Sequence, residues 1–189
     1  MSTGSDTSAA DTSASDVLAF WRAAGPAKWF KKDSAFDAEI ISRFAALRRE
    51  AAAGALSDWE VSAESALALV IVLDQFPRNM FRGKADAFAT DALARGVAER
   101  AMARGLDRQV PASERQFFYL PFEHSENLAD QERAIALMGT LGNPDLTRWA
   151  ELHADVIRRF GRFPHRNSVL GRASTREEQA FLDAGGFAG

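Results

Sequence analysis

The apolar run "ALALVIVL", Ala66 to Leu73, sets the first limit on the architecture. If it forms a helix over about residues 63–75, apolar side chains project from nearly every side of that helix. Such a helix needs other elements to cover it all round, so we expect it at the centre of the molecule. Its β-branched residues Val70, Ile71 and Val72 also suit a strand, and the run alone leaves both open. Pro77 is expected to end the helix.

Most of the chain after Ser15 follows the helical pattern, in which apolar residues recur every three or four positions. Predicted helices cover about residues 16–24, 34–53, 87–104, 112–120, 128–140 and 144–160, and a short one follows Ser174. Their capping residues are Ser15, Asp33, Asp86, Asn143 before Pro144, and the pair Ser174 and Glu177. Pro121 is expected to kink or restart its helix. About seven or eight helices joined by short links predict an all-α domain of antiparallel pairs.

Composition narrows the class of protein. The chain has 189 residues, enough for one domain, which we expect over residues 15–189. Residues 1–14 are rich in Ser, Thr, Ala and Asp and are expected to form a disordered leader. The absence of cysteine excludes disulfides, zinc–thiolate sites and thiol nucleophiles, and it fits a cytoplasmic location. The net charge of -3 and the short apolar run predict neither a nucleic-acid partner nor a membrane, while the oligomeric state stays open.

Two distant segments share the motif Phe-Pro-(x)-Arg-Asn. The first corner is "DQFPRNMFRG", Asp74 to Gly83, and the second corner is "RFGRFPHRNSVLGR", Arg159 to Arg172. In each, proline blocks helix continuation, and the Arg-Asn pair beyond it can reach a carboxylate or an external anion. Asp74 alternatively forms an internal ion pair that fixes the first corner. The candidate ligand-binding residues of the two corners are Asp74, Arg78, Asn79, Arg82, Arg162, Arg166 and Asn167.

A third segment, "FFYLPFEHSEN", adds carboxylates and a histidine. At helical spacing, Tyr119, Glu123 and Glu126 fall on one side of the helix, and His124 points elsewhere. If the corners meet, these carboxylates supply counter-charge for the converging arginines. Tyr119 and Glu126 are therefore further ligand-binding candidates, and the catalytic candidates are His165, His124 and Glu123.

The remaining signals concern histidines and metals. His153 lies on the apolar stripe of its helix, where a core histidine with one satisfied hydrogen bond is expected. His165 lies in the second corner and is the histidine favoured for function. The spacings typical of di-iron sites and zinc proteases are missing, so neither a metal site nor a cofactor is predicted.

The strings "LDQFPRNMFRG", "FFYLPFEHSE" and "RFGRFPHRN" together resemble the bacterial family catalogued as domain of unknown function 924. The resemblance runs from about Val17 to Leu182 in the same order. It implies an all-helical fold related to tetratricopeptide-like arrays, and it brings no activity, substrate or cofactor with it.

Two functional hypotheses from different classes follow. In the first, both corners and the Glu123/Glu126 segment wall a pocket for a small anionic or phosphorylated ligand, with hydrolytic or acid–base chemistry. In the alternative, the chain is a helical-repeat adaptor for a peptide or protein partner, and the three strings are purely structural. The arginines discriminate between them, because an arginine that only stabilises the fold is costly to remove, whereas one that faces a ligand is not.

Overall fold

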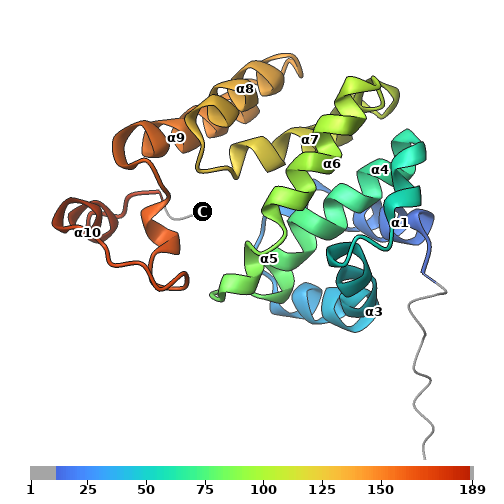
Figure 1. Ribbon diagram of the computed structural model, residues 1–189, viewed down its shortest axis with the longest axis horizontal. Coiled ribbons are helices and arrows are strands. Elements are labelled where there is room, and N and C mark those ends of the chain that lie inside the picture. The colour runs from blue at the N-terminus through green and yellow to red at the C-terminus, as the bar shows by residue number, and fades with distance from the viewer. Residues whose placement is uncertain (1–11, 188–189) are drawn as a thin grey trace, which may run out of the picture.

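The computed structural model describes residues 12–187, and within them the chain is helical with no strand (Figure 1). The α-helices are α1 (Ala14–Ala24), α2 (Pro26–Trp29), α3 (Ser34–Ala52), α4 (Ala63–Val70), α5 (Phe76–Met80), α6 (Asp91–Ala103), α7 (Ala112–Glu123), α8 (Leu128–Gly139), α9 (Pro144–Phe160) and α10 (Arg176–Asp183). Short 3-10 turns are η2 (Ser57–Val61), η4 (Ala85–Ala87), η5 (Asp107–Gln109) and η6 (Pro164–Arg166). The all-α class is confirmed, and the tetratricopeptide-like arrangement stays a prediction. A disordered leader was predicted over residues 1–14, and residues 1–11 of it lie outside the described part of the chain.

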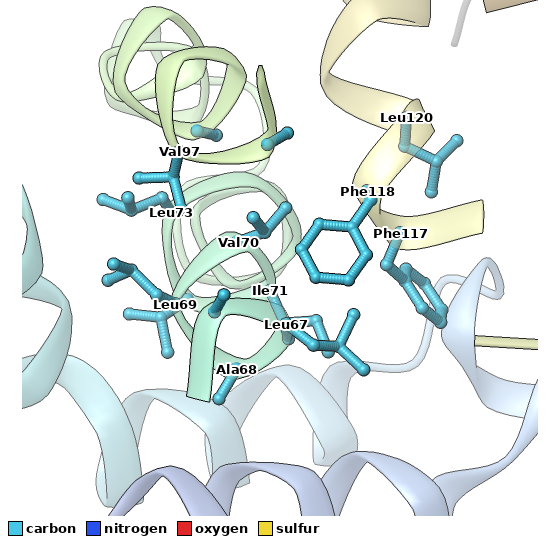
Figure 2. Packing of buried hydrophobic residues seen from close by; sticks show 14 of the residues in the cluster. Leu67, Ala68, Leu69, Val70, Ile71, Leu73, Val97, Phe117, Phe118 and Leu120 are labelled. Atoms are coloured by element: carbon cyan, nitrogen blue, oxygen red, sulfur yellow. The ribbon is translucent and has the colours of Figure 1, made fainter. Parts of the chain in front are cut away.

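The apolar run forms the centre of the molecule as a helix, as expected. Every residue of α4 from Ala66 to Val70 is at most 3% exposed. Figure 2 shows α4 enclosed between Val97 of α6 and the rings of Phe117 and Phe118 on α7. Its β-branched residues are thus accommodated in a helix, because packing on all sides outweighs their modest preference for strands.

Pro77 does not end the central helix, contrary to the prediction. After α4 the chain passes into η3 (Ile71–Gln75), a π-helical segment that closes with a hydrogen bond from Phe76 N–H to the carbonyl of Ile71. Pro77 then lies in the first turn of α5, where its missing N–H leaves no bond unmade. π-Helical segments are rare and cluster at functional sites, and this one carries Asp74.

Asp33 and Asn143 are confirmed as caps, whereas the caps of α1, α6 and α10 lie at other residues than those predicted. α1 is capped by Ser13 in a capping box with Asp16, and α10 by Thr175 with Glu178, so the predicted caps Ser15 and Ser174 are wrong. α6 begins at Asp91, later than predicted, because η4 and a turn occupy residues 85–90. Pro121 lies inside α7, which continues through it to Glu123.

Asn143 caps α9 through a hydrogen bond from Asp145 N–H to its side chain, at 3.1 Å. We expect Asn143→Ala to lower the free energy of unfolding by about 1 kcal/mol, because that N–H loses its acceptor. Urea denaturation measures the loss. Glu151→Ala, an exposed change on the same helix, is the control and should stay within about 0.5 kcal/mol of wild type. An equal loss in both variants would contradict a capping effect.

The helices fall into two groups around α7. α1, α3, α4, α5 and α6 form the main body, while α8 and α9 pack as a hairpin that continues from α7 (Figure 1). The second corner and α10 follow the C-terminal end of α9 and lie next to a small apolar cluster of Val156, Ile157 and Phe163 (Figure 1). None of the helices within residues 12–187 is long and apolar enough to span a bilayer.

Candidate active site

One arginine from each corner reaches the same carboxylate. Asp91, the first residue of α6, accepts hydrogen bonds from Nη1 and Nη2 of Arg78 at 2.9 and 3.0 Å. It also lies 3.5 Å from Nη1 of Arg166. The fold therefore brings a guanidinium group from each corner together, at a carboxylate that was not among the sequence-based candidates.

Asp74 is fully buried, and three side chains surround its carboxylate. Gln75 donates to Oδ2 at 2.6 Å, His124 Nδ1 lies 2.8 Å from Oδ1, and Arg78 Nη1 lies 3.4 Å from Oδ1. Burial raises the pKa of Asp74, but the charge of Arg78 and the hydrogen bonds from His124 and Gln75 outweigh it and hold the pKa below its usual range. Asp74 is therefore ionised at neutral pH. The π-helical segment directs this charge towards the end of α7.

His124, the C-cap of α7, is held in one tautomer by Asp74. Because an ionised carboxylate only accepts, Nδ1 carries the proton and the lone pair of the neutral ring is on Nε2. Burial and the charge of Arg78 lower the pKa of His124, so the ring is neutral at pH 7. Nε2 makes no hydrogen bond within residues 12–187 and is not among their fully buried atoms that lack a partner, and the His124 side chain is 13% exposed.

Glu123 and His153 form a neutral pair and not an ion pair. Oε1 of Glu123 lies 3.1 Å from Nδ1 of His153, which donates to the carbonyl of Trp149 at 2.8 Å. Burial and the charge of Asp74 raise the pKa of Glu123 to about 8. Burial lowers the pKa of His153 to about 3. At neutral pH a protonated carboxyl group thus lies beside a neutral imidazole.

All three histidines of the chain gather here. The rings of His124 and His153 are 6.3 Å apart, and Phe163 packs between His153 and His165 at 5.7 and 5.5 Å. The ring of Phe187 lies 4.4 Å from that of His153 and 5.8 Å from that of His165. Burial and the charge of Arg166 lower the pKa of His165 to about 4, and its buried Nδ1 has no partner among the described residues.

Arg166 is the least compensated charge in the site. Its side chain is 8% exposed, and its guanidinium group lies 4.5 Å from the ring centres of both Phe88 and Phe163. Its Nε is buried without an acceptor in the described part of the chain, and its one ionic contact is the 3.5 Å approach to Asp91. Burial and the charge of Arg78 lower the pKa of Arg166 to about 10.

These groups define the polar cluster. Its members are Asp74, Arg78, Asp91, Glu123, His124, His153, His165 and Arg166. They combine an ionised carboxylate that orients an imidazole, a protonated carboxyl group and a guanidinium group with unused donors. Within residues 12–187 no three side chains of the metal-ligating types come together as a metal site. The cluster is suited to proton transfer next to a bound anion.

Three predicted residues lie away from the polar cluster. Asn79 donates to Asp37 on α3 at 2.7 Å, and Arg82 binds the same carboxylate at 2.5 and 3.0 Å. The hydroxyl of Tyr119 donates to Asp107 at 2.9 Å. Each of the three has a partner inside the protein. Asn79 and Arg82 connect the first corner to α3, and Tyr119 connects α7 to η5.

The side chains of the second corner make contacts in two places, the polar cluster and α10. Arg162 binds Glu178 on α10 at 2.6 and 2.8 Å, and Asn167 lies 3.3 Å from the same carboxylate. Glu126 accepts two hydrogen bonds from Arg172 at 2.7 and 2.9 Å and a third from Phe163 N–H. Because α7 ends at Glu123, Glu126 does not share a helical face with Tyr119, contrary to the prediction.

Sequence reasoning missed two polar members of the cluster. The pattern predicts this helix from about residue 87 with Asp86 as its cap, which gives no sign that Asp91 is the first residue of α6. His153 was assigned to the core, and its hydrogen bond to Trp149 fits that assignment, but its neighbour Glu123 comes from another helix. A count of histidines near the three strings would have singled out His124 and His165 only.

Comparison with known proteins agrees with this fold. The family model described as bacterial protein of unknown function (DUF924) matches residues 17–186. The structure of the protein of unknown function ATU0120 from Agrobacterium tumefaciens is similar, with a TM-score of 0.88 and 50% sequence identity, over 90% of this chain and 97% of that one. No curated protein matches the chain. The chain therefore belongs to the bacterial family of unknown function DUF924.

Proposed function

We propose that the polar cluster binds a small anionic molecule through Arg166. The observation that carries this proposal is the buried guanidinium group whose Nε has no acceptor among the described residues. Leaving a buried donor unpaired costs roughly 1–3 kcal/mol, and more for a charged group, so an anionic acceptor at this point is favourable.

The packing of Arg166 limits the shape of that acceptor. Phe88 and Phe163 cover its faces at 4.5 Å, so only the edge of the guanidinium plane is left for hydrogen bonds. Nη1 points to Asp91, which leaves the edge formed by Nε and Nη2. Two parallel donors on one edge match the two oxygens of a carboxylate or a phosphate.

The other arginines of the corners support the assignment by contrast. Arg78, Arg82 and Arg162 each make two hydrogen bonds to a single carboxylate, on α6, α3 and α10 respectively. Their charges are compensated inside the protein. Arg166 differs because the Asp91 carboxylate that it approaches is already occupied by Arg78.

The adaptor alternative has less support. A groove for a peptide needs apolar anchors in one continuous row. In the described part of the chain, the exposed large hydrophobic residues are spread from the α2–α3 link to the second corner, namely Phe30, Ile41, Val61, Leu93, Leu128, Trp149, Leu152 and Leu170. Such scatter is ordinary for a protein surface.

Thermal denaturation with added anions tests the proposal. We expect phosphate or succinate to raise the melting temperature of the wild type above a chloride control of equal ionic strength. Arg166→Met keeps the apolar packing between the two rings and removes the charge, so it should abolish the anion-specific rise. It should also be at least as stable as wild type without anion, since a poorly compensated buried charge is removed.

The matched control is Arg100→Met. Arg100 pairs with Glu60 on the surface at 2.7 Å, away from the polar cluster, so its replacement should leave the anion-specific rise intact. If neither anion stabilises the wild type beyond chloride, the proposal is wrong. An undiminished rise in Arg166→Met would contradict it equally, because the anion would then bind elsewhere.

A further inference from the structure

The proposed function gives no role to the acids and the histidine on one side of the polar cluster. Asp74, His124 and Glu123 lie on the side of the cluster formed by η3 and the end of α7. At neutral pH Asp74 is ionised and repels an anion, and Glu123 and His124 carry no charge that would attract one. Their arrangement is that of groups that move protons.

His124 has the geometry of a general base. Its Nδ1–H is fixed on Asp74 at 2.8 Å, which presents the lone pair of Nε2 away from that carboxylate. Asp74 is held in turn by Gln75 and Arg78, so the imidazole has a rigid support. A carboxylate behind an imidazole fixes its tautomer and stabilises the imidazolium that forms when the ring takes a proton.

Glu123 has the opposite property. Its side chain is 5% exposed, lies beside neutral His153, and has no cation close to it within residues 12–187. It keeps its proton at neutral pH, while Asp74 has lost its own. Neighbouring titratable groups whose pKa values are shifted in opposite directions are typical of an acid and a base that work together.

The site also limits the substrate. Transfer of a phosphoryl group needs several cations around its oxygens. Here Arg78 is bound to Asp91, Arg162 to Glu178 and Arg172 to Glu126, which leaves one guanidinium edge. A single fork of donors fits one carboxylate, so the reacting bond belongs to another part of the same molecule.

We propose that the polar cluster hydrolyses esters that carry a carboxylate group, with His124 as general base, Asp74 as its positioning residue and Glu123 as general acid. This inference rests on the proposed anion site at Arg166, which holds the carboxylate.

The reaction begins at His124. Its Nε2 takes a proton from water as the water oxygen forms a bond to the ester carbonyl carbon. The bond from that carbon to the alcohol oxygen then breaks, and the leaving oxygen keeps the electron pair and takes the proton of Glu123. The proton on His124 returns to Glu123 through solvent, and the products are a carboxylic acid and an alcohol.

Three chromogenic probes test the activity. These are p-nitrophenyl hydrogen succinate, p-nitrophenyl acetate, which lacks the carboxylate, and p-nitrophenyl phosphate. We expect the wild type to hydrolyse the succinate ester with a kcat/KM about 10- to 100-fold above that for the acetate, the range given by a charge-assisted hydrogen bond. Preference for the phosphate, or no preference between succinate and acetate, would overturn the assignment.

Variants at the two catalytic positions test the roles. His124→Asn keeps a donor for Asp74 and removes the base, so kcat should fall about 100-fold or more. Glu123→Gln removes the acid, and it should lower kcat for monomethyl succinate far more than for the p-nitrophenyl ester. The reason is that methoxide needs a proton to leave, whereas p-nitrophenolate does not. Arg100→Met is the control that should match wild type.

Binding and turnover are read separately. The anion-specific rise in melting temperature with succinate should persist in His124→Asn, because Arg166 is unchanged. If succinate binds and the wild type turns over none of the three probes, hydrolysis is wrong and the anion site stands. If neither succinate nor phosphate binds, both ideas fall, and if phosphate alone binds, the anion site stands and hydrolysis of carboxylate esters is wrong. Turnover that survives in His124→Asn would also overturn the assignment of the base.

Discussion

Arg78→Met is expected to lower the free energy of unfolding by about 3–5 kcal/mol, the range for breaking a buried ion pair on one side. Arg78 compensates two carboxylates at once, Asp74 and Asp91, and donates to the backbone carbonyl of Asp74 at 2.6 Å. Asp74 is 0% exposed, so its charge has no access to water when the guanidinium group is gone. Urea denaturation at neutral pH measures the loss.

Two comparisons make this result specific. Arg82→Met removes the ion pair between Arg82 and Asp37. Because the Arg82 side chain is 36% exposed, this change should lower the free energy of unfolding by no more than about 1 kcal/mol. Adding Asp74→Asn to Arg78→Met should recover part of the loss, because the uncompensated charge disappears. A loss of under about 1 kcal/mol in Arg78→Met would mean that Asp74 is not held as an ion by Arg78.

Arg78 and Arg166 are expected to behave oppositely, although the same motif supplies both. In the first corner the arginine belongs to α5 and meets two carboxylates, whereas in the second it is the last residue of η6 and approaches one that is already bound. The motif therefore predicts a bend and an arginine beyond it. The role of that arginine depends on which carboxylates other segments bring near.

The helices of this chain are predictable because their signals are local. Apolar spacing, Asn143 before Pro144 and Asp33 before α3 all act within a few residues, and they gave the correct class and most boundaries. Pro77 was misread because a π-helical segment before it shifts the hydrogen-bond register. The apolar pattern gives no sign of the π-helical bonding here, since every residue of η3 is buried and no exposed face marks the helical period.

The polar cluster was only partly predictable, for a different reason. Asp74, His124 and Arg166 stand in unusual strings, and the sequence marks them as candidates. Asp91 and His153 stand in ordinary amphipathic helices, and only the packing of α6 against the corners and of α9 against α7 gives them charged or titratable neighbours. Contacts between distant segments decide which candidate is compensated, and a single sequence does not contain them.

Glu123→Gln is expected to change the pH dependence of stability. Below about pH 4.5 the carboxyl group is protonated in both the folded and the unfolded chain. Between that value and the raised pKa of about 8, the unfolded chain loses the proton while the folded protein keeps it, so stability falls as pH rises. The amide variant lacks this loss. The difference in unfolding free energy between variant and wild type should therefore grow by roughly 4 kcal/mol from pH 4.5 to 8.

The three histidines also make the stability of the protein depend on pH, but in the opposite direction and only below their ordinary pKa. Their pKa values are lowered by folding, so their contribution is complete above pH 6.5 and is lost as pH falls. Above pH 6.5 the fall in wild-type stability is thus the mark of Glu123. Glu132→Gln, an exposed change on α8, should follow the wild-type curve. If Glu123→Gln follows it too, Glu123 is ionised in the folded protein and is no proton donor, and the hydrolytic mechanism loses its general acid.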